Sequence, residues 1–370
     1  MILVLASEAV LFVLAVAGIL AERPLPLAAT GGVLAALALL LRFSPKLRGA
    51  LVGAFTAHRT GALAGAAVFA VLLPFALRAS PYWTFVATLA LLYVTIGQGL
   101  NFQIGTAGLI NLAGAAFAGL GGYTVGLLTV TGGWPAWLAL PLGPVVAVVV
   151  GALLFVPILK TRGHYLALVT IAFVFIFNIL MNNFEFTGGP QGIKNIPTLQ
   201  VFGYAFTTRL TLFGVALPAH ANFYFAALVV AGLTTAVIRR LHDSWLGLAL
   251  NTLRDDEIAA KCSGVSITRA KLTAFSVGNF FIGLGGAFYA LMVGFISPPM
   301  MMTLSMMSVI IIGGVDSIPG VVLGACLLLP LPERFRFLHE YRLLLYGVVI
   351  LVMLLYRPQG LWPAAVRRYR

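Results

Sequence analysis

Charged side chains are scarce in this chain of 370 residues: they make up 9% of the sequence, whereas hydrophobic residues make up 61%. A soluble domain carries about a quarter charged residues, because its surface must face water. Lipid can take the place of water around apolar side chains, so this composition excludes an ordinary soluble enzyme. It predicts an all-α, polytopic transmembrane bundle with about 10 to 12 spans, some of them broken or re-entrant, because several apolar runs are short for a straight crossing.

Catalytic and metal-binding motifs are also missing. The sequence holds no GxxxxGKS or GxxxxGKT run, the phosphate-binding loop of many ATPases, and no HExxH, CxxC or GxSxG pattern. The five histidines are scattered, and two cysteines, Cys262 and Cys326, are too few to form a metal site. We therefore expect a chain that is not an enzyme, binds no cofactor or metal and does not hydrolyse ATP.

Negative charge is scarce as well, with 10 acidic residues against 23 lysines and arginines and a net charge of +13. The basic residues gather in short runs between apolar stretches, near residues 42–59, 160–162, 239–271 and 357–370. Cytoplasmic loops of membrane proteins carry such an excess of Lys and Arg, so we expect these runs and both termini on the cytoplasmic side. Nucleic-acid binding would need basic and aromatic residues on one folded surface, which these separate runs do not predict.

Ionisable residues are nearly absent from the apolar runs, where Glu8 and Asp316 occur. Ion-coupled carriers usually need intramembrane carboxylates or basic residues, so this scarcity disfavours that class. Neutral polar residues take their place, and each one either joins helices by hydrogen bonds or faces a transport path. Because these residues are dense between positions 98 and 111, we predict a translocation path lined by Gln98, Asn101, Gln103, Asn111 and Asn178.

Glycine is abundant, with 40 residues, and its spacing within the apolar runs predicts closely packed helices. The segment FAGLGG at 117–122 recurs as FIGLGG at 281–286, which hints at a parallel duplication of two halves. The GxxxG spacing occurs at Gly61/Gly65, Gly122/Gly126 and Gly320/Gly324.

A polar segment between residues 182 and 222 falls on the exterior side if every apolar run crosses the membrane. Its centre is rich in turn-forming residues and cannot continue a helix. We predict a periplasmic loop formed by Thr187, Gly188, Gly189, Pro190 and Gln191.

The basic segment at 239–271 contains a predicted short helix. Thr252 is followed three residues later by an acid, as in a capping box, so Thr252 is expected to cap a helix over Leu253–Cys262. Gly264 is placed to end this helix, because glycine readily adopts the left-handed conformation found after a helix.

An isolated helix of this length is marginal in water, even with a Glu257–Lys261 pair four residues apart. It therefore needs a surface to pack on, either on its own membrane domain or in a groove of a separate subunit. The second alternative makes it a coupling helix. Its coupling residues would be Arg254, Asp255, Asp256, Glu257, Ala260 and Gly264.

Four parts of the sequence together resemble the branched-chain amino acid ABC importer permeases of the LivM type. The first is GLNFQIGTAGLINLAGAAFAGLGGY at 99–123, in which residues 111–114 depart from the Ser-Leu-Gly-His common in that family. The others are RGHYLALVT at 162–170 with TGGPQGI at 187–193, RDDEIAA at 254–260 with KLTAF at 271–275, and GGVDSIPG at 313–320 with YRPQGL at 356–361. The resemblance covers residues 82–363.

This resemblance implies a permease subunit in the lipid of a bacterial inner membrane, forming a solute path with a second, LivH-like permease. Two cytoplasmic ATPases would hold ATP and magnesium, and a periplasmic binding protein would deliver the solute. Branched-chain or other hydrophobic amino acids are the expected solutes, with urea, amides or small aromatic carboxylates as alternatives. A stand-alone ion-coupled carrier or channel is the alternative class.

Three parts of the chain are expected on the same grounds. N-terminal helices and a basic loop would occupy residues 1–80, and a basic tail would occupy 364–370. The core permease domain would lie between them at 81–363, with its coupling helix near 252–264.

Overall fold

The computed structural model describes residues 2–20, 33, 53, 57–158, 165–201, 203–212, 214–298, 303–334 and 341–364. Most of the apolar run at 27–41, the basic run at 160–162, most of the basic run at 42–59 and the tail beyond residue 364 lie outside the described residues. The chain forms two compact units, Met1–Phe85 with Arg209–Phe225 and Val86–Thr208 with Ala226–Arg370.

The first unit is built on two apolar helices that pack together. The rings of Phe12 and Phe69 stack between them with centroids 5.0 Å apart. The Tyr224 hydroxyl donates a hydrogen bond of 2.7 Å to the carbonyl of Ala70, which fastens the second helix to the start of α10 (His220–His242). The elements within this unit are α1 (Ile2–Leu20), α4 (Arg59–Ala76) and the antiparallel hairpin of β4 (Leu210–Leu212) and β5 (Val215–Leu217).

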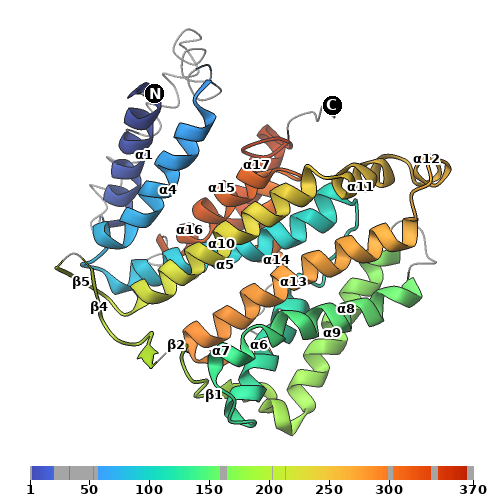
Figure 1. The fold of residues 1–370 in the computed structure, drawn as a ribbon, viewed down its shortest axis with the longest axis horizontal. Helices are drawn as coiled ribbons and strands as arrows, with labels where there is room; N and C mark the ends of the chain where they lie inside the picture. Colours follow the sequence, from blue (N-terminus) through green and yellow to red (C-terminus); the bar gives the residue numbers. More distant parts are fainter. Residues whose placement is uncertain are drawn as a thin grey trace. The chain divides into compact units, whose positions relative to one another are not determined.

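The second unit holds most of the helices, and α5 and α10 have residues in both units (Figure 1). Its strands are only two residues long. Its elements are α5 (Pro81–Asn101), η1 (Phe102–Thr106), α6 (Gly114–Val130), α7 (Ala136–Ala139), α8 (Leu142–Ile158), α9 (Tyr165–Asn183), η2 (Glu185–Thr187), η3 (Gly189–Gln191), β1 (Ile193–Lys194), β2 (Gln200–Val201), β3 (Tyr204–Ala205), α10 (His220–His242), α11 (Trp245–Asp255), α12 (Glu257–Cys262), α13 (Ile267–Val293), β6 (Phe295–Ile296), α14 (Thr303–Gly313), α15 (Ile318–Leu328), α16 (Pro330–Arg334) and α17 (Arg342–Tyr356).

The expected polytopic helical fold is confirmed by the length and composition of these helices. Five of the described helical segments are long and apolar enough to cross a membrane, namely Pro81–Thr106, Ala136–Val156, Tyr165–Asn183, His220–His242 and Ile267–Val293. Shorter apolar helices accompany them, including α6 and parts of α1, α4 and α17.

The core of the second unit is a glycine-lined contact between α6, α8 and α13. Phe117 of α6 lies beside Phe275 of α13, and Gly122 of α6 lies beside Ala290 of α13. Residue numbers therefore increase in the same direction along both helices, which run parallel. The two copies of the recurring FxGLGG segment therefore pack against each other. A methyl group at Gly121 would overlap the Gly283 backbone, which shows how close the helices come.

Two helix breaks interrupt apolar runs, in line with the expectation that some spans are broken or re-entrant. The apolar run at 104–130 does not form one helix, because η1 is a π-helix and an irregular stretch from Ala107 follows it before α6 begins. Gly108, at φ +68°, and the Asn111 side chain, which accepts a hydrogen bond from the Ala113 backbone, favour this break over a continuous helix.

The apolar run at 304–318 does not form one helix either, because α14 ends at Gly313. The turn 314–317 then leads into α15, which packs back against α14. Each of these helices has 11 residues, a length of about 16 Å, so neither crosses a hydrocarbon core of about 30 Å as a straight helix.

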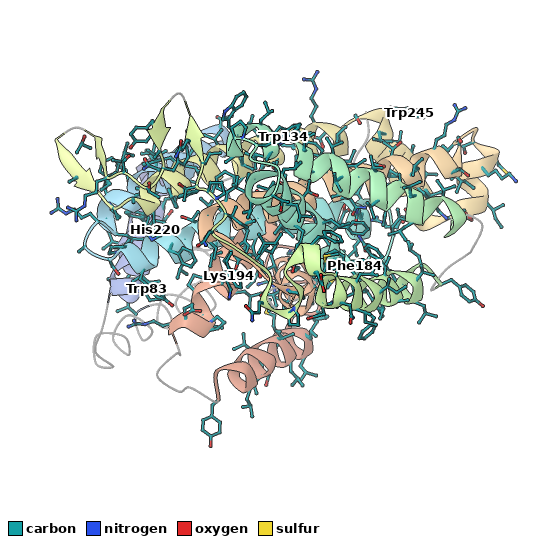
Figure 2. All side chains as sticks on the ribbon, turned by 90° about the horizontal axis from the view of Figure 1, so that it is seen from below. Trp83, Trp134, Phe184, Lys194, His220 and Trp245 are labelled. Atoms are coloured by element: carbon teal, nitrogen blue, oxygen red, sulfur yellow. The ribbon has the colours of Figure 1, made fainter. Side chains whose placement is uncertain are left out.

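α13 separates two polar ends of the second unit. It begins at Ile267, after α12, and ends at Val293, before β6, a length of about 40 Å. We call these the α12 end (residues 242–269) and the β1 end (residues 184–200 and 294–298). Figure 2 shows Trp245 near the α12 end, well away from Lys194 of β1.

Candidate functional site

The predicted coupling helix is divided into two helices in the structure. α11 already contains Thr252, whose hydroxyl donates to the Leu248 carbonyl at 2.9 Å, so the prediction that Thr252 caps the helix is wrong. Asp256 is the cap of α12, because its Oδ1 accepts from the backbone nitrogens of Ile258 at 2.8 Å and Ala259 at 3.1 Å. The apolar side of α11 explains the difference, since its burial continues the first helix past Thr252.

The end of α12 agrees with the expectation for Gly264. This glycine has φ +80° and donates to the Lys261 carbonyl, while the Val265 nitrogen donates to the Ala260 carbonyl. These two bonds form a Schellman motif, which ends a helix by satisfying its last carbonyls. Glu257 binds Lys271 of α13 at 3.0 Å in the structure, in place of the expected pair with Lys261.

α12 has one face on its own chain and one face turned outward. Ala260 is fully buried, and the Glu257–Lys271 ion pair ties the helix to α13. Ile258 is 69% exposed on the outward face, beside the exposed Asp255 and Asp256. α12 thus packs on the chain's own domain, while its outward face still exposes the apolar side chain of Ile258 among acidic ones.

Arg254 points inward, toward the two helix breaks. Its Nη1 donates to the carbonyl of Gly105 in η1 and lies 3.0 Å from Oδ2 of Asp316 in the α14–α15 turn. The same carboxylate accepts from the Thr106 hydroxyl at 2.9 Å, and His242 Nε2 lies 3.5 Å from it. One carboxylate therefore joins the ends of α10, α11 and η1 to the α14–α15 turn.

The backbone around Asp316 supports the same cluster. The Asp316 nitrogen donates to Asn101 Oδ1 at 2.9 Å, and Asp316 has φ +65°, in the left-handed region that costs an L-residue energy. A methyl group at Gly105 would lie 2.5 Å from the Asp316 nitrogen, and one at Gly108 would lie 2.8 Å from Cγ of Arg254. Both glycines thus permit the close approach that the contacts require.

A second polar cluster lies buried between η1, the stretch that follows it and α13. Gln103 Nε2 donates to the Phe275 carbonyl at 2.8 Å and to Asn279 Oδ1 at 3.0 Å. Gln103 Oε1 accepts from Asn111 Nδ2 at 2.7 Å. Both side chains are fully buried, so the structure brings these two predicted path residues together in a hydrogen-bonded network.

The other predicted path residues have different surroundings. Asn101 belongs to the Asp316 cluster, and Gln98 Nε2 donates to the Thr235 hydroxyl of α10 at 2.9 Å. Asn178 donates to the Val174 carbonyl of its own helix at 2.9 Å. The structure therefore brings Gln103 and Asn111 together and gives the other three residues separate partners.

The predicted periplasmic loop is an ordered turn at the β1 end. Thr187 is fully buried and its hydroxyl donates to the carbonyls of Phe184 and Met181. Gly188 and Gly189 both have positive φ, and Pro190 occupies the start of η3, where a missing N–H costs nothing. Gln191 Oε1 accepts from Lys194, whose strand β1 pairs with β6.

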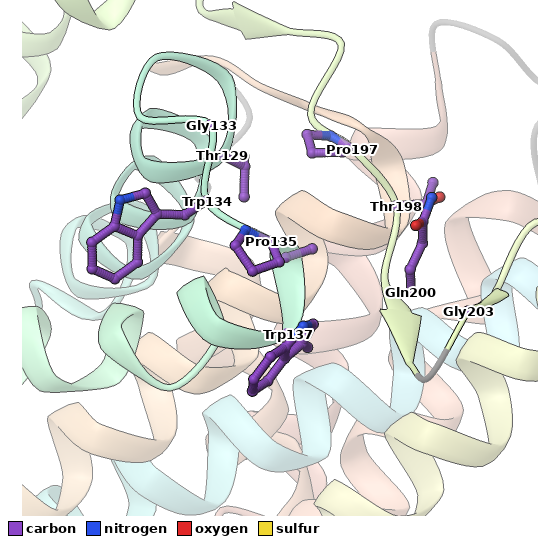
Figure 3. Close-up of a pocket in the computed structure, with 10 residues that line it drawn as sticks. Thr129, Gly133, Trp134, Pro135, Trp137, Pro197, Thr198, Gln200 and Gly203 are labelled. Atoms are coloured by element: carbon purple, nitrogen blue, oxygen red, sulfur yellow. The ribbon is translucent and has the colours of Figure 1, made fainter.

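A cavity of about 570 Å³ opens near this end of the second unit. Figure 3 shows Trp134 and Trp137 on the α6–α7 side and Pro197, Thr198 and Gln200 on the facing segment. Trp134 is 43% exposed and Trp137 54% exposed, an arrangement suited to an apolar group or to the lipid interface.

Several of these residues were missed by reasoning from the sequence. Asp316 was noticed only as a rare carboxylate, and Thr106, His242 and the two tryptophans were not selected. The signal for Asp316 was its rarity, because an ionisable residue in an apolar run needs a partner. Within the described part of the chain, no group of three or more His, Cys, Asp and Glu side chains could hold a metal ion.

Comparisons with known proteins agree with the motifs. Residues 82–354 match the family described as branched-chain amino acid transport system permease component. The chain is 38% identical over 294 residues to the high-affinity branched-chain amino acid transport system permease protein LivM of Salmonella typhimurium, and 37% identical to the Escherichia coli protein of that name. Each alignment covers 75% of this chain and 69% of the relative.

A more distant relative comes from Methanocaldococcus jannaschii. It is a probable branched-chain amino acid transport permease protein LivM, 24% identical over 245 residues, with 61% of this chain and 68% of the relative covered. No solved structure gives a significant match to the chain.

Proposed function

The chain belongs to the family of branched-chain amino acid transport permease components, and on that premise we propose that it is the permease subunit of an ATP-binding cassette importer. It forms the solute path with a second, LivH-like permease, and a periplasmic binding protein delivers the solute. The sequence has no phosphate-binding loop, so two partner ATPases must supply the energy. Branched-chain or other hydrophobic amino acids are the proposed solutes, in line with the names of the relatives.

The outward face of α12 is the observation that supports this function most directly. Ala260 and the Glu257–Lys271 pair hold the base of the helix against α13, while Ile258 stays exposed among acidic side chains. A rigid helix that presents an apolar anchor inside a charged rim suits a groove on another protein. We assign this face, with Asp255 and Asp256 beside it, to contact with a partner ATPase.

The proposed cycle is alternating access. ATP binding draws the two ATPases together and moves α12 with them, the path opens toward the binding protein, and hydrolysis resets it. The loop from Thr187 to Gln191 and the cavity beside Trp134 would then face the binding protein. Gln103 and Asn111 would shape the wall of the path. Their polar atoms are already hydrogen-bonded to protein groups, which holds both side chains in place.

Reconstitution in liposomes tests the function. The chain would be assembled with a LivH-like permease and two ATPases, and leucine uptake would be measured with the binding protein outside and ATP inside. Uptake should require every component. Uptake by the purified chain alone, driven by an ion gradient or by leucine itself, would support the stand-alone carrier or channel and refute the proposal.

A variant of α12 tests the assigned contact. Ile258→Asp should abolish copurification of the ATPases while membrane insertion stays normal, because a charge would replace the anchor. Ile258→Leu keeps an apolar side chain of the same size and serves as the control. Equal ATPase binding by both variants would remove α12 from the interface.

A further inference from the structure

Asp316 has a backbone conformation that glycine adopts more easily than aspartate does. Its φ of +65° lies in the left-handed region, which glycine adopts freely and aspartate adopts less readily. The turn 314–317 that holds it connects two half-length helices, and turns of this kind can absorb changes in backbone angle. The contacts of the carboxylate help to hold Asp316 in this conformation.

These contacts reach segments that are distant in the sequence. Arg254 ends α11 and leads directly into α12, whereas Gly105 and Thr106 close the π-helix η1. His242 ends α10. The Asp316 side chain is 9% exposed and that of Arg254 is 35% exposed, so the ion pair is shielded on one side and keeps more strength than a surface pair.

The other side of the turn is held by the chain after α17. The Leu361 nitrogen donates to the Ile312 carbonyl at 2.7 Å, and the Trp362 nitrogen donates to the Gly313 carbonyl at 2.9 Å. The end of α14 is thus fixed on one side by backbone bonds and on the other by the Asp316 carboxylate.

We infer that Asp316 is a positioning residue that ties the coupling segment α11–α12 to both helix breaks through Arg254, so that these elements move as one body during transport. This inference rests on the proposed function, because α12 is the part on which the ATPases would act. A displacement of α12 is passed through Arg254 to η1 and to the α14–α15 turn. Arg254 therefore transmits motion and does not itself contact the ATPase.

Asp316→Gly provides a sharp test, since it suits the left-handed conformation and removes the carboxylate that makes the contacts. In the reconstituted importer, leucine taken up per ATP hydrolysed should fall about tenfold while ATP hydrolysis continues. Arg254→Gln should give the same loss, and the double variant should be no worse than either single one. Arg269→Gln, which removes an exposed charge at the same end, should keep the normal ratio.

A purely structural role would lower the amount of assembled complex and leave the ratio of uptake to ATP hydrolysis unchanged, which would overturn the inference. If Asp316→Gly does not assemble, Arg254→Gln decides, because the partly exposed Arg254 can be replaced with less effect on folding. Normal coupling in that variant would also overturn the inference.

A distance measurement on the purified chain separates this inference from the proposed function. With Cys262 and Cys326 replaced by serine, spin labels at Ser263→Cys and Val315→Cys report on α12 and on the turn. One narrow distance distribution is expected, and Asp316→Gly should broaden it. An unchanged distribution would refute the link even if the importer works, whereas a broadened one would uphold it even if no uptake is found.

Discussion

The hydrogen bonds of each buried polar side chain indicate whether that side chain stabilises the molecule or contacts the solute. Gln103 uses both atoms of its amide, toward Asn279 and Phe275 on one side and Asn111 on the other. A buried polar group that loses its partner costs about 1–3 kcal/mol, although pairs within membranes average less. The network should therefore act first on stability.

Gln103→Met keeps the shape of the side chain and removes its hydrogen bonds. The variant should lose about 1–2 kcal/mol of stability, because Asn111 and Asn279 remain buried without that partner. Thermal unfolding in detergent, followed by tryptophan fluorescence, measures the loss, with the exposed Asn183→Ala as control. A change in the KM for leucine at normal stability would instead favour direct contact with solute.

The Asp256 side chain caps α12 by accepting hydrogen bonds from the first turn of the helix. Asp256→Ala should destabilise the helix by about 1 kcal/mol and raise hydrogen exchange of residues 258–262 about fivefold. Asp256→Asn retains a capping side chain and should exchange at the normal rate. Thr252→Ala should also have no effect on α12, and faster exchange in that variant would restore the capping box expected from the sequence.

At the scale of whole elements, glycines set the spacing of the central helices. Gly121 meets the Gly283 backbone, and Gly286 meets Ala118, at the contact between α6 and α13. Because glycine has no side chain, the backbones of the two helices come into direct contact at these positions. In lipid, such close packing takes the place of the hydrophobic effect in holding helices together.

Gly121→Ala should force α6 and α13 apart and cost about 1–3 kcal/mol, since the added methyl group overlaps a carbonyl on a helix that cannot move freely. Unfolding temperature and yield of the purified chain measure this cost. Gly232→Ala, at an open position on α10, is the matched control and should be neutral or stabilising, because alanine favours a helix more than glycine does. Similar losses in both variants would mean that close packing at Gly121 does not explain the effect.

At the scale of the molecule, α13 separates the α12 end from the β1 end, and the excess of basic residues predicts which end faces the cytoplasm. Arg239, Arg240 and Arg254 precede α12, whereas Lys194 is the basic residue of the β1–η3 region. This distribution of charge predicts a cytoplasmic α12 end.

Labelling of single cysteines with a membrane-impermeant maleimide tests this orientation. In a Cys326→Ser background, the exposed Cys262 should react in inverted vesicles and not in spheroplasts. A Trp134→Cys, Cys262→Ser variant should give the opposite result, because residue 134 lies near the other end. Labelling of both positions from one side would contradict the topology.

Features that depend on composition and on near neighbours can be predicted from the amino-acid sequence. Low charge requires a lipid-facing bundle, the spacing of Lys and Arg predicts its orientation, and Gly264 ends α12 because a left-handed residue is a local requirement. The family motifs belong to the same category, since they can be read along the chain.

Contacts between distant segments are visible only in the folded chain. Thr252 lies within a helix because burial along α11 outweighs a local capping signal, and Arg254 faces Asp316, 62 residues away, instead of solvent. Gln103 and Asn279 are 176 residues apart and share a hydrogen bond. Such pairs depend on which helices pack together. Periodicity and capping signals describe one helix without its neighbours, so they do not predict these pairs.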